Sequence, residues 1–248
     1  MNHYESFYQL HHQQAPLVIA NAWNVKSALL IEKAGFDAIA TSSGAIADSL
    51  GYKDGQQIPF AELLYLVKRI KASTNIPLSV DMERGYTEDL VVLNEYIQQI
   101  IDAGAVGINL EDAQGEEAYQ NKLSSINNYL LKTSQQLFIN ARTDAFLQKL
   151  DNPLETTIRR ARRYQEAGAH GLFVTGMRDV EIIKDIVSAT TLPVNVAVNS
   201  KLSSIKTLSD CGVKRISMAV NLYSAGYKKV DAMLTAIKAE NSFDPLFQ

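Results

Sequence analysis

The chain contains very little cysteine. Cys211 is the single one among 248 residues, so no intrachain disulfide can form. Disulfide-stapled secreted domains are therefore excluded as models. The segment 1–16 lacks the apolar run of a secretory signal, and no stretch approaches the roughly 20 continuous apolar residues that span a bilayer. We therefore expect a cytoplasmic protein with no membrane partner.

Clustered positive charge is also scarce. The chain has 24 Lys and Arg against 27 Asp and Glu, a formal net charge of -3. Four arginines lie between Glu155 and Glu166, but their helical spacing and flanking acids are typical of a solvated helix face. Because nucleic-acid binding needs concentrated Lys and Arg, we expect no nucleic-acid partner.

Short apolar runs alternate with longer segments of helical periodicity along the whole chain. With 46% hydrophobic and 21% charged residues, the composition is that of a folded protein. No low-complexity linker divides it, so we predict one domain, 1–248. The predicted strands are 17–20, 38–40, 77–80, 106–110, 137–140, 171–174, 193–196 and 214–218. The predicted helices are 25–34, 60–73, 90–103, 121–133, 153–167, 180–189, 202–211 and 222–240.

These strands are apolar throughout rather than alternating, which is typical of parallel sheets buried on both faces. Eight strand–helix units predict an α/β fold, a closed (β/α)8 or TIM barrel. A doubly wound open sheet is the alternative. It usually carries a glycine-rich phosphate motif after its first strand, and here that position reads Asn21-Ala22-Trp23-Asn24.

Acidic residues gather where the predicted strands end. In such a barrel, residues at the carboxyl ends of the strands build the active site. Neighbouring carboxylates repel one another unless a cation neutralises them, and Mg²⁺ prefers oxygen ligands while keeping several waters. We therefore predict a Mg²⁺ site, with Mn²⁺ as a possible substitute, some ligands acting through water. Its predicted ligands are Asp54, Asp81, Glu83 and Glu111.

A site for a small anion is predicted beside the metal. The backbone N–H groups and hydroxyls of Ser42-Ser43-Gly44 could form an anion-binding nest. Arg142, at another strand end, offers a bidentate fork for a carboxylate or phosphonate. We predict Arg142 and Ser42 as catalytic residues. The predicted substrate-binding set is Ser42, Ser43, Gly44, Asp81 and Arg142.

These motifs resemble the isocitrate lyase and phosphoenolpyruvate mutase superfamily over nearly the whole chain. The motifs that carry the resemblance are Ser49-Leu50-Gly51-Tyr52-Lys53-Asp54, Val80-Asp81-Met82-Glu83-Arg84-Gly85-Tyr86, Gly107-Ile108-Asn109-Leu110-Glu111-Asp112 and Asn140-Ala141-Arg142-Thr143-Asp144. The resemblance implies a Mg²⁺-dependent enzyme acting on a 2-oxo acid or its precursor. It also implies a homo-oligomer, dimer or tetramer, whose subunits exchange the last helix. By position, the four acids match the family's metal site and Arg142 matches its anion-binding arginine.

The chain also departs from the family. The lyase branch has a Lys-Lys-Cys-Gly-His loop after strand four, whereas segment 112–120 contains no Cys. Cys211 cannot replace that Cys, because it is expected at the opposite rim. The Lys and the gating-loop motif of the phosphonate branches are absent too, and Thr175 stands where the lyase branch has Glu. The resemblance therefore implies a divergent branch.

The sequence predicts a Mg²⁺-dependent lyase that cleaves a C–C bond of a small 2-oxo or 2-hydroxy di-acid through a metal-stabilised enolate. Decarboxylation needs no further group. Retro-aldol cleavage needs a base, for which Tyr86, Tyr119 or Glu116 could serve if a loop closes. The alternatives are a P–C bond enzyme and a catalytically inactive metabolite-binding barrel. A Schiff-base aldolase would need a Lys at a strand end, and the sequence has none there.

Overall fold

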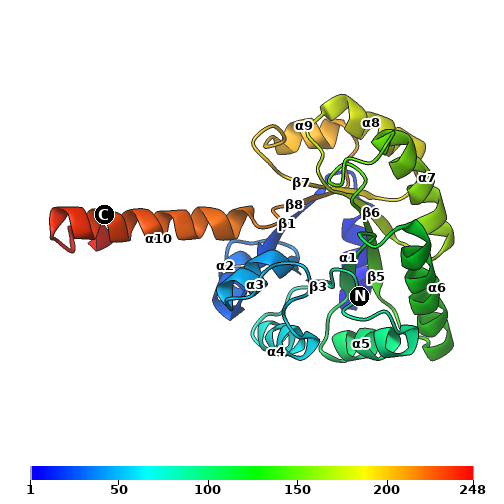
Figure 1. Ribbon diagram of the computed structural model, residues 1–248, viewed down its shortest axis with the longest axis horizontal. Helices are drawn as coiled ribbons and strands as arrows, with labels where there is room; N and C mark the ends of the chain where they lie inside the picture. The colour runs from blue at the N-terminus through cyan, green and yellow to red at the C-terminus, as the bar shows by residue number, and fades with distance from the viewer. Residues whose placement is uncertain (1, 248) are drawn as a thin grey trace.

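Eight parallel strands form a closed barrel in the computed structural model, which describes residues 2–247 (Figure 1). Each strand pairs with the next in the sequence, and β8 closes the ring on β1 through Leu17 opposite Arg215. The predicted (β/α)8 barrel is confirmed. The strands are β1 Leu17–Ala22, β2 Ile39–Thr41, β3 Leu78–Asp81, β4 Gly107–Glu111, β5 Phe138–Thr143, β6 Gly171–Val174, β7 Val194–Ala197 and β8 Arg215–Ser217.

Helices surround this barrel because their apolar stripes pack on the outer faces of the strands. The major core is built between strands and helices from residues such as Leu63, Ile97 and Ile126, all fully buried. The helices are α1 His3–Leu10, α2 Val25–Lys33, α3 Ser43–Ser49, α4 Phe60–Lys71, α5 Leu90–Asp102, α6 Glu116–Thr133, α7 Pro153–Glu166, α8 Val180–Ala189, α9 Ile205–Asp210 and α10 Asn221–Glu240; a 3-10 helix, η1, spans Asp244–Phe247.

Helix α1 closes the amino-terminal end of the barrel. Phe7 packs with Leu17, Val106 and Phe138, which lie at or just before the starts of their strands. A Cβ on Gly107 would lie 2.8 Å from the Phe7 ring, so this position allows the ring to enter. No helix was predicted in residues 1–16, so α1 is an addition to the sequence-based prediction.

Two other helix predictions need correction. Helix α6 begins at Glu116 rather than at 121, so Glu116 and Tyr119 belong to a helix and not to a loop. Helix α3, which follows β2 directly, was not predicted. Ser42 caps it, since the Ser42 hydroxyl accepts a hydrogen bond from the N–H of Ala45.

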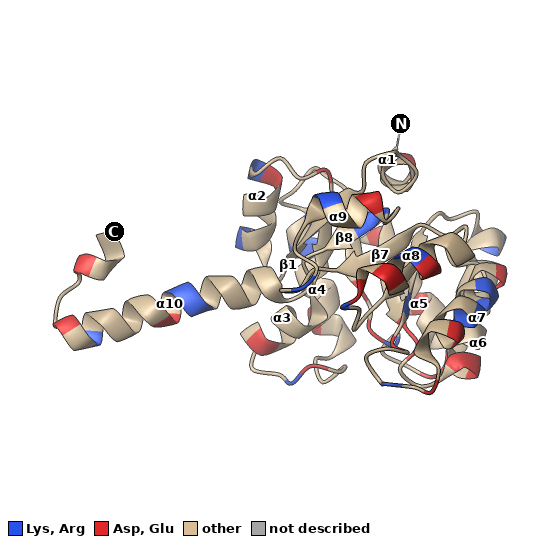
Figure 2. Cartoon of the chain, turned by 90° about the horizontal axis from the view of Figure 1, so that it is seen from above, with Lys and Arg blue, Asp and Glu red and all other residues tan. Residues whose placement is uncertain are grey.

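Helix α10 leaves the barrel and projects away from it (Figures 1 and 2). Near its start, Tyr223 donates a hydrogen bond to Asp48 and packs edge-to-face on Trp23, with ring centroids 5.2 Å apart. Further along, Val230 and Leu234 are exposed. No helix within residues 2–247 combines the length and apolar character needed to cross a membrane.

Candidate active site

Asp81, the last residue of β3, is held between two strand ends. Its N–H donates to Thr41 Oγ1 at 2.8 Å, and its Oδ2 accepts from the Ser43 hydroxyl at 2.8 Å and the Ser43 N–H at 3.4 Å. Both Ser43 donors therefore point at a carboxylate, and the Ser42 hydroxyl caps α3. Substrate binding by Ser42, Ser43 and Gly44 stays a prediction.

Glu83 occupies a strained position next to Asp81. Its φ of 46° is left-handed, and the residue is buried. The Tyr86 hydroxyl donates to Glu83 Oε1 at 3.0 Å, and the Glu83 carbonyl accepts from the N–H of Glu111 at 2.7 Å. Burial and the neighbouring Asp81 charge raise the pKa of Glu83 to about 7.

Asp54 reaches the site from the exposed loop between α3 and α4. Its Oδ2 lies so close to Gly44 that a Cβ there would be 3.1 Å away. The Asp54 charge also contributes to the raised pKa of Glu83. Loop and strand acids therefore lie in one electrostatic neighbourhood, although they are about 30 residues apart in the sequence.

Arg142 on β5 is clamped between two carboxylates. Its Nε and Nη2 donate to the two oxygens of Asp144 at 2.7 and 3.0 Å, and its Nη1 lies 2.7 Å from Glu111 Oε2. Burial raises the pKa of Glu111 to about 7 although Arg142 opposes the shift, because Asp81 and Asp144 add negative charge. Two of the five guanidinium N–H groups donate hydrogen bonds to Asp144, while Nη1 forms an ion pair with Glu111.

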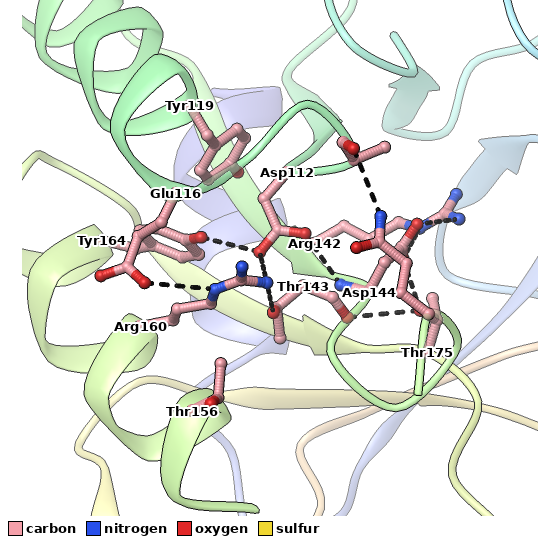
Figure 3. A network of polar contacts seen from close by, with 12 residues as sticks. Asp112, Glu116, Tyr119, Arg142, Thr143, Asp144, Thr156, Arg160, Tyr164 and Thr175 are labelled. Carbon is pink, nitrogen blue, oxygen red and sulfur yellow. Dashed lines mark hydrogen bonds and ion pairs between the residues drawn. The ribbon is translucent and has the colours of Figure 1, made fainter. Parts of the chain in front are cut away.

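A buried network behind the strand ends holds Asp144 in place (Figure 3). Asp112 Oδ1 accepts from the N–H of Asp144 at 2.9 Å, while its Oδ2 accepts from Arg160 Nη1 and from the Tyr164 hydroxyl, both at 2.7 Å. The Thr175 hydroxyl lies 2.5 Å from Asp144 Oδ1. Sequence reasoning missed this network, although Asp112 and Asp144 stood among the strand-end acids.

The arginines of α7 correct one earlier interpretation. Arg159 and Arg163 are exposed and pair with Glu116 at 2.7 and 2.6 Å, in line with a solvated face (Figure 2). Arg160, however, is buried against Asp112. The interpretation of the whole segment as a solvated face was therefore wrong for Arg160.

Two of the three candidate bases, Tyr119 and Glu116, already have structural partners away from the predicted metal site. Tyr119 is buried and its hydroxyl donates to the Leu110 carbonyl at 2.7 Å. Glu116 binds the α7 arginines, which lower its pKa although partial burial opposes them. Tyr86 alone of the three is in contact with a predicted site acid.

The four predicted ligands supply only carboxylate oxygens, the donor atoms that Mg²⁺ prefers. Beyond the effect of burial, the charges of Asp81 and Asp54 raise the pKa of Glu83, and those of Asp81 and Glu83 raise the pKa of Glu111, so the four acids lie in one neighbourhood. Yet within residues 2–247 no group of three or more Asp, Glu, His or Cys side chains is arranged to hold a metal ion. An ion that keeps most of its waters needs fewer direct ligands. Glu83, whose pKa burial and the Asp81 charge raise to about 7, forms no ion pair within residues 2–247, so the residues fit Mg²⁺. Their role as ligands stays a prediction.

Comparison with known proteins decides the family. The family model described as phosphoenolpyruvate phosphomutase matches residues 7–238. The chain belongs to the phosphoenolpyruvate phosphomutase family. The resemblance to the isocitrate lyase and phosphoenolpyruvate mutase superfamily is thus confirmed.

Relatives of this family member carry several names. An uncharacterized protein of Mycobacterium tuberculosis is 34% identical over 222 residues, which cover 89% of this chain and 84% of the relative. An oxaloacetate decarboxylase of Rhodopseudomonas palustris is 30% identical over 204 residues, covering 76% and 68%. A 2-methylisocitrate lyase of Halalkalibacterium halodurans is 26% identical, covering 98% and 80%. A crystal structure of a putative phosphonomutase from Burkholderia cenocepacia matches with a TM-score of 0.90 and 34% identity, covering 94% and 99%.

Proposed function

We propose that this phosphoenolpyruvate phosphomutase family member is a Mg²⁺-dependent lyase that cleaves a C–C bond in a small 2-oxo or 2-hydroxy di-acid. The observation that carries the proposal is Arg142, held between Glu111 and Asp144 beside a surplus of acids at the strand ends. A cation site next to an anion-binding guanidinium suits a chelating di-acid. The relatives named oxaloacetate decarboxylase and 2-methylisocitrate lyase support the same reaction class.

Asp54, Asp81, Glu83 and Glu111 would hold the metal. When bound, Mg²⁺ supplies a Lewis acid for the substrate oxygen on which negative charge develops. Arg142 orients the substrate by donating N–H groups that are not bonded to Asp144 to a substrate carboxylate. Asp144, fixed by Asp112 and Thr175, keeps that guanidinium in one position before substrate arrives.

Decarboxylation is the C–C cleavage that these residues support best. Retro-aldol cleavage requires a base for the departing hydroxyl, and Tyr119 and Glu116 have structural partners instead. Loss of CO₂ leaves a carbanion equivalent that solvent can protonate, so no such base is needed. Tyr86 contacts Glu83 but donates its proton to that carboxylate, and burial together with the Glu83 charge raises the pKa of its hydroxyl, which disfavours it as a retro-aldol base.

A second candidate is cleavage of a P–C bond. The 34% identical structure of a putative phosphonomutase supports it. Against it, Ala113 follows Asp112, where the phosphonate-cleaving branches carry Lys. The same site could bind a phosphonate in place of a carboxylate, since Arg142 suits both.

The test is a substrate panel with purified protein and Mg²⁺ or Mn²⁺. Oxaloacetate, branched 2-hydroxy tricarboxylates and phosphonopyruvate are compared by pyruvate or other 2-oxo acid release, with protein-free Mg²⁺ reactions subtracted. We expect turnover of a di-acid, and roughly a 100-fold lower kcat/KM for Arg142→Lys. Asp185→Asn, an exposed acid on α8, is the matched control and keeps full activity.

Three outcomes would contradict the proposal. Turnover of phosphonopyruvate alone would favour the P–C reaction. Binding of di-acids without turnover of any would favour a metabolite-binding barrel. Trapping of a substrate by borohydride would indicate Schiff-base chemistry.

A further inference from the structure

A charged side chain lies inside the barrel beneath the active site. Arg215 on β8 is fully buried, and its Nη2 lies 3.5 Å from Oδ1 of Asn109 on β4. Strands β8 and β4 stand on opposite sides of the eight-stranded ring. The Arg215 side chain therefore crosses the barrel interior.

The surroundings of Arg215 are polar but uncharged. Asn140 donates to the same Asn109 oxygen at 2.9 Å, and Asn195 is the buried strand partner of Arg215 on β7. Phe7 lies on the other side, with its ring centroid 5.9 Å from the guanidinium carbon. Within residues 2–247 Arg215 makes no ion pair, and its Nε and Nη1 have no hydrogen-bond partner.

Stability does not explain such an arrangement. Burying a charge without an opposite charge costs several kcal/mol, about the scale of a whole domain's stability, and apolar replacements of buried charges are often neutral or stabilising. The cost therefore points to a task that needs a positive charge at this place.

The position of Arg215 relative to the acids suggests the task. Asn109 is the strand partner of Asp81 and precedes Glu111 by two residues on the same face of β4. Burial lowers the pKa of Arg215 to about 10, and the Asp81 charge acts in the opposite direction. Arg215 is therefore protonated at neutral pH and lies within electrostatic reach of the site.

We propose that Arg215 is a fixed positive charge beneath the site that strengthens the binding of the anionic substrate and weakens the binding of the cation. The inference rests on the proposed function, because it concerns Mg²⁺ and a di-acid at the same site. Arg142 is paired with both Glu111 and Asp144, and Asp81 and Glu83 form no ion pair within residues 2–247, so a dianion entering this rim meets excess negative charge. A permanent charge held in a low-dielectric interior reduces that repulsion without reorganisation. In this proposal Arg215 contacts neither Mg²⁺ nor the di-acid. It acts on both at a distance, through the electrostatic potential that its charge adds to the site.

The proposal predicts opposite changes in two affinities. Calorimetry measures Mg²⁺ binding to the free protein and then oxalate binding to the Mg²⁺-loaded protein, for the wild type, Arg215→Met and Arg215→Lys. In Arg215→Met, Mg²⁺ should bind roughly tenfold more tightly and oxalate roughly tenfold more weakly, as expected for one charge acting through a protein interior. Arg215→Lys keeps the charge and should restore both affinities.

Loss of packing would lower the affinities for Mg²⁺ and oxalate together. A change of both affinities in the same direction in Arg215→Met would therefore overturn the inference. Unchanged affinities would overturn it as well. Arg215→Gln is a second neutral variant in case the Met variant does not fold, and urea unfolding checks each protein. If the wild type itself takes up no Mg²⁺, the proposed function fails and the inference fails with it. If the wild type binds both ligands, parallel changes defeat the inference alone.

Discussion

Asp112 links the outer helices to the active site through a fully buried carboxylate. Its two oxygens accept hydrogen bonds from the Arg160 guanidinium, the Tyr164 hydroxyl and the backbone N–H of Asp144. A carboxylate buried this deeply is tolerated because three charged or polar donors reach its two oxygens. The same side chain that stabilises the barrel therefore also positions Asp144, and through it Arg142.

We expect Asp112→Asn to lower the free energy of unfolding by about 3–5 kcal/mol, because the buried Arg160 would lose its closer carboxylate at 2.7 Å and keep only Glu116 at 3.5 Å. Urea unfolding measures the loss. The control is Asp210→Asn, which removes an exposed pair with Lys206 and should cost less than about 1 kcal/mol. Equal effects of the two substitutions would show that the buried pair is not a stabilising contact.

His11 should make the barrel sensitive to acid. Its ring is buried and stacks on Phe138 with centroids 4.1 Å apart, while its Nδ1 lies 2.7 Å from the Phe7 carbonyl. Burial, helped by the Arg215 charge, lowers the pKa of His11 to about 3. The unfolded chain takes up this proton below about pH 6.5 and the folded chain does not, so stability falls as pH drops from about 6.5 toward 3.

The corresponding measurement compares unfolding of the wild type and His11→Phe at pH 7 and pH 5. We expect the wild type to lose about 2 kcal/mol more than the variant over this interval, because Phe keeps the stacking but takes up no proton. Parallel stability curves for the two proteins would contradict the assignment of a buried neutral His11.

The sequence predicted where the acids are but not what they bind. Asp81 and Glu111 follow apolar strands, and barrel geometry sends all strand ends to one rim. The partners of Ser43 and Arg142 depend instead on side-chain rotamers selected by tertiary neighbours, which no local pattern encodes. For the same reason Arg160 looked like one more arginine on a solvated helix.

Helix α3 places Gly44 against the Asp54 carboxylate. Gly44→Ala should push Asp54 away, because the new Cβ would lie 3.1 Å from its Oδ2. Ala is the better helix former by up to about 1 kcal/mol, so the variant should fold at least as stably as the wild type while binding Mg²⁺ more weakly. Calorimetric titration together with urea unfolding separates the two effects. Unchanged Mg²⁺ affinity would remove Asp54 from the predicted metal site.

Helices with a clear apolar period were predicted, and the exceptions have physical causes. Helix α1 buries one residue, Phe7, so it lacks a stripe; its signal is the capping box between Asn2 and Glu5. Helix α6 has a charged first turn at Glu116 and Glu117, which is favourable at a helix amino terminus but resembles a polar loop. The capping box would have found α1, and the acidic first turn would have found the start of α6.

For the molecule as a whole, α10 and the groove beside it are unusual. A groove of about 620 Å³ runs between α2 and α10, lined by residues that include Trp23, Phe36 and Leu222. The closed barrel topology could be predicted from the sequence by counting eight strand–helix units. The projection of α10 could not be predicted, because it depends on contacts that local periodicity does not describe. Exchange of this helix between subunits stays a prediction.

We expect the protein to elute with the mass of a dimer or tetramer in size-exclusion chromatography with light scattering. Leu234→Asp should shift it toward the monomer, because this exposed leucine of α10 would meet an apolar partner surface. Leu131→Asp, at an exposed position on α6, is the control and should keep the assembly. A wild-type monomer would contradict helix exchange.

The central claim is that acids from separate strands and a loop share one dication at the rim of the barrel. The most direct measurement is calorimetric titration of Mg²⁺ into the wild type and into Asp81→Asn at matched folded concentration. We predict one site per chain in the wild type and loss of most of its affinity in the variant. No uptake by the wild type, or equal affinity of the two proteins, would contradict the account.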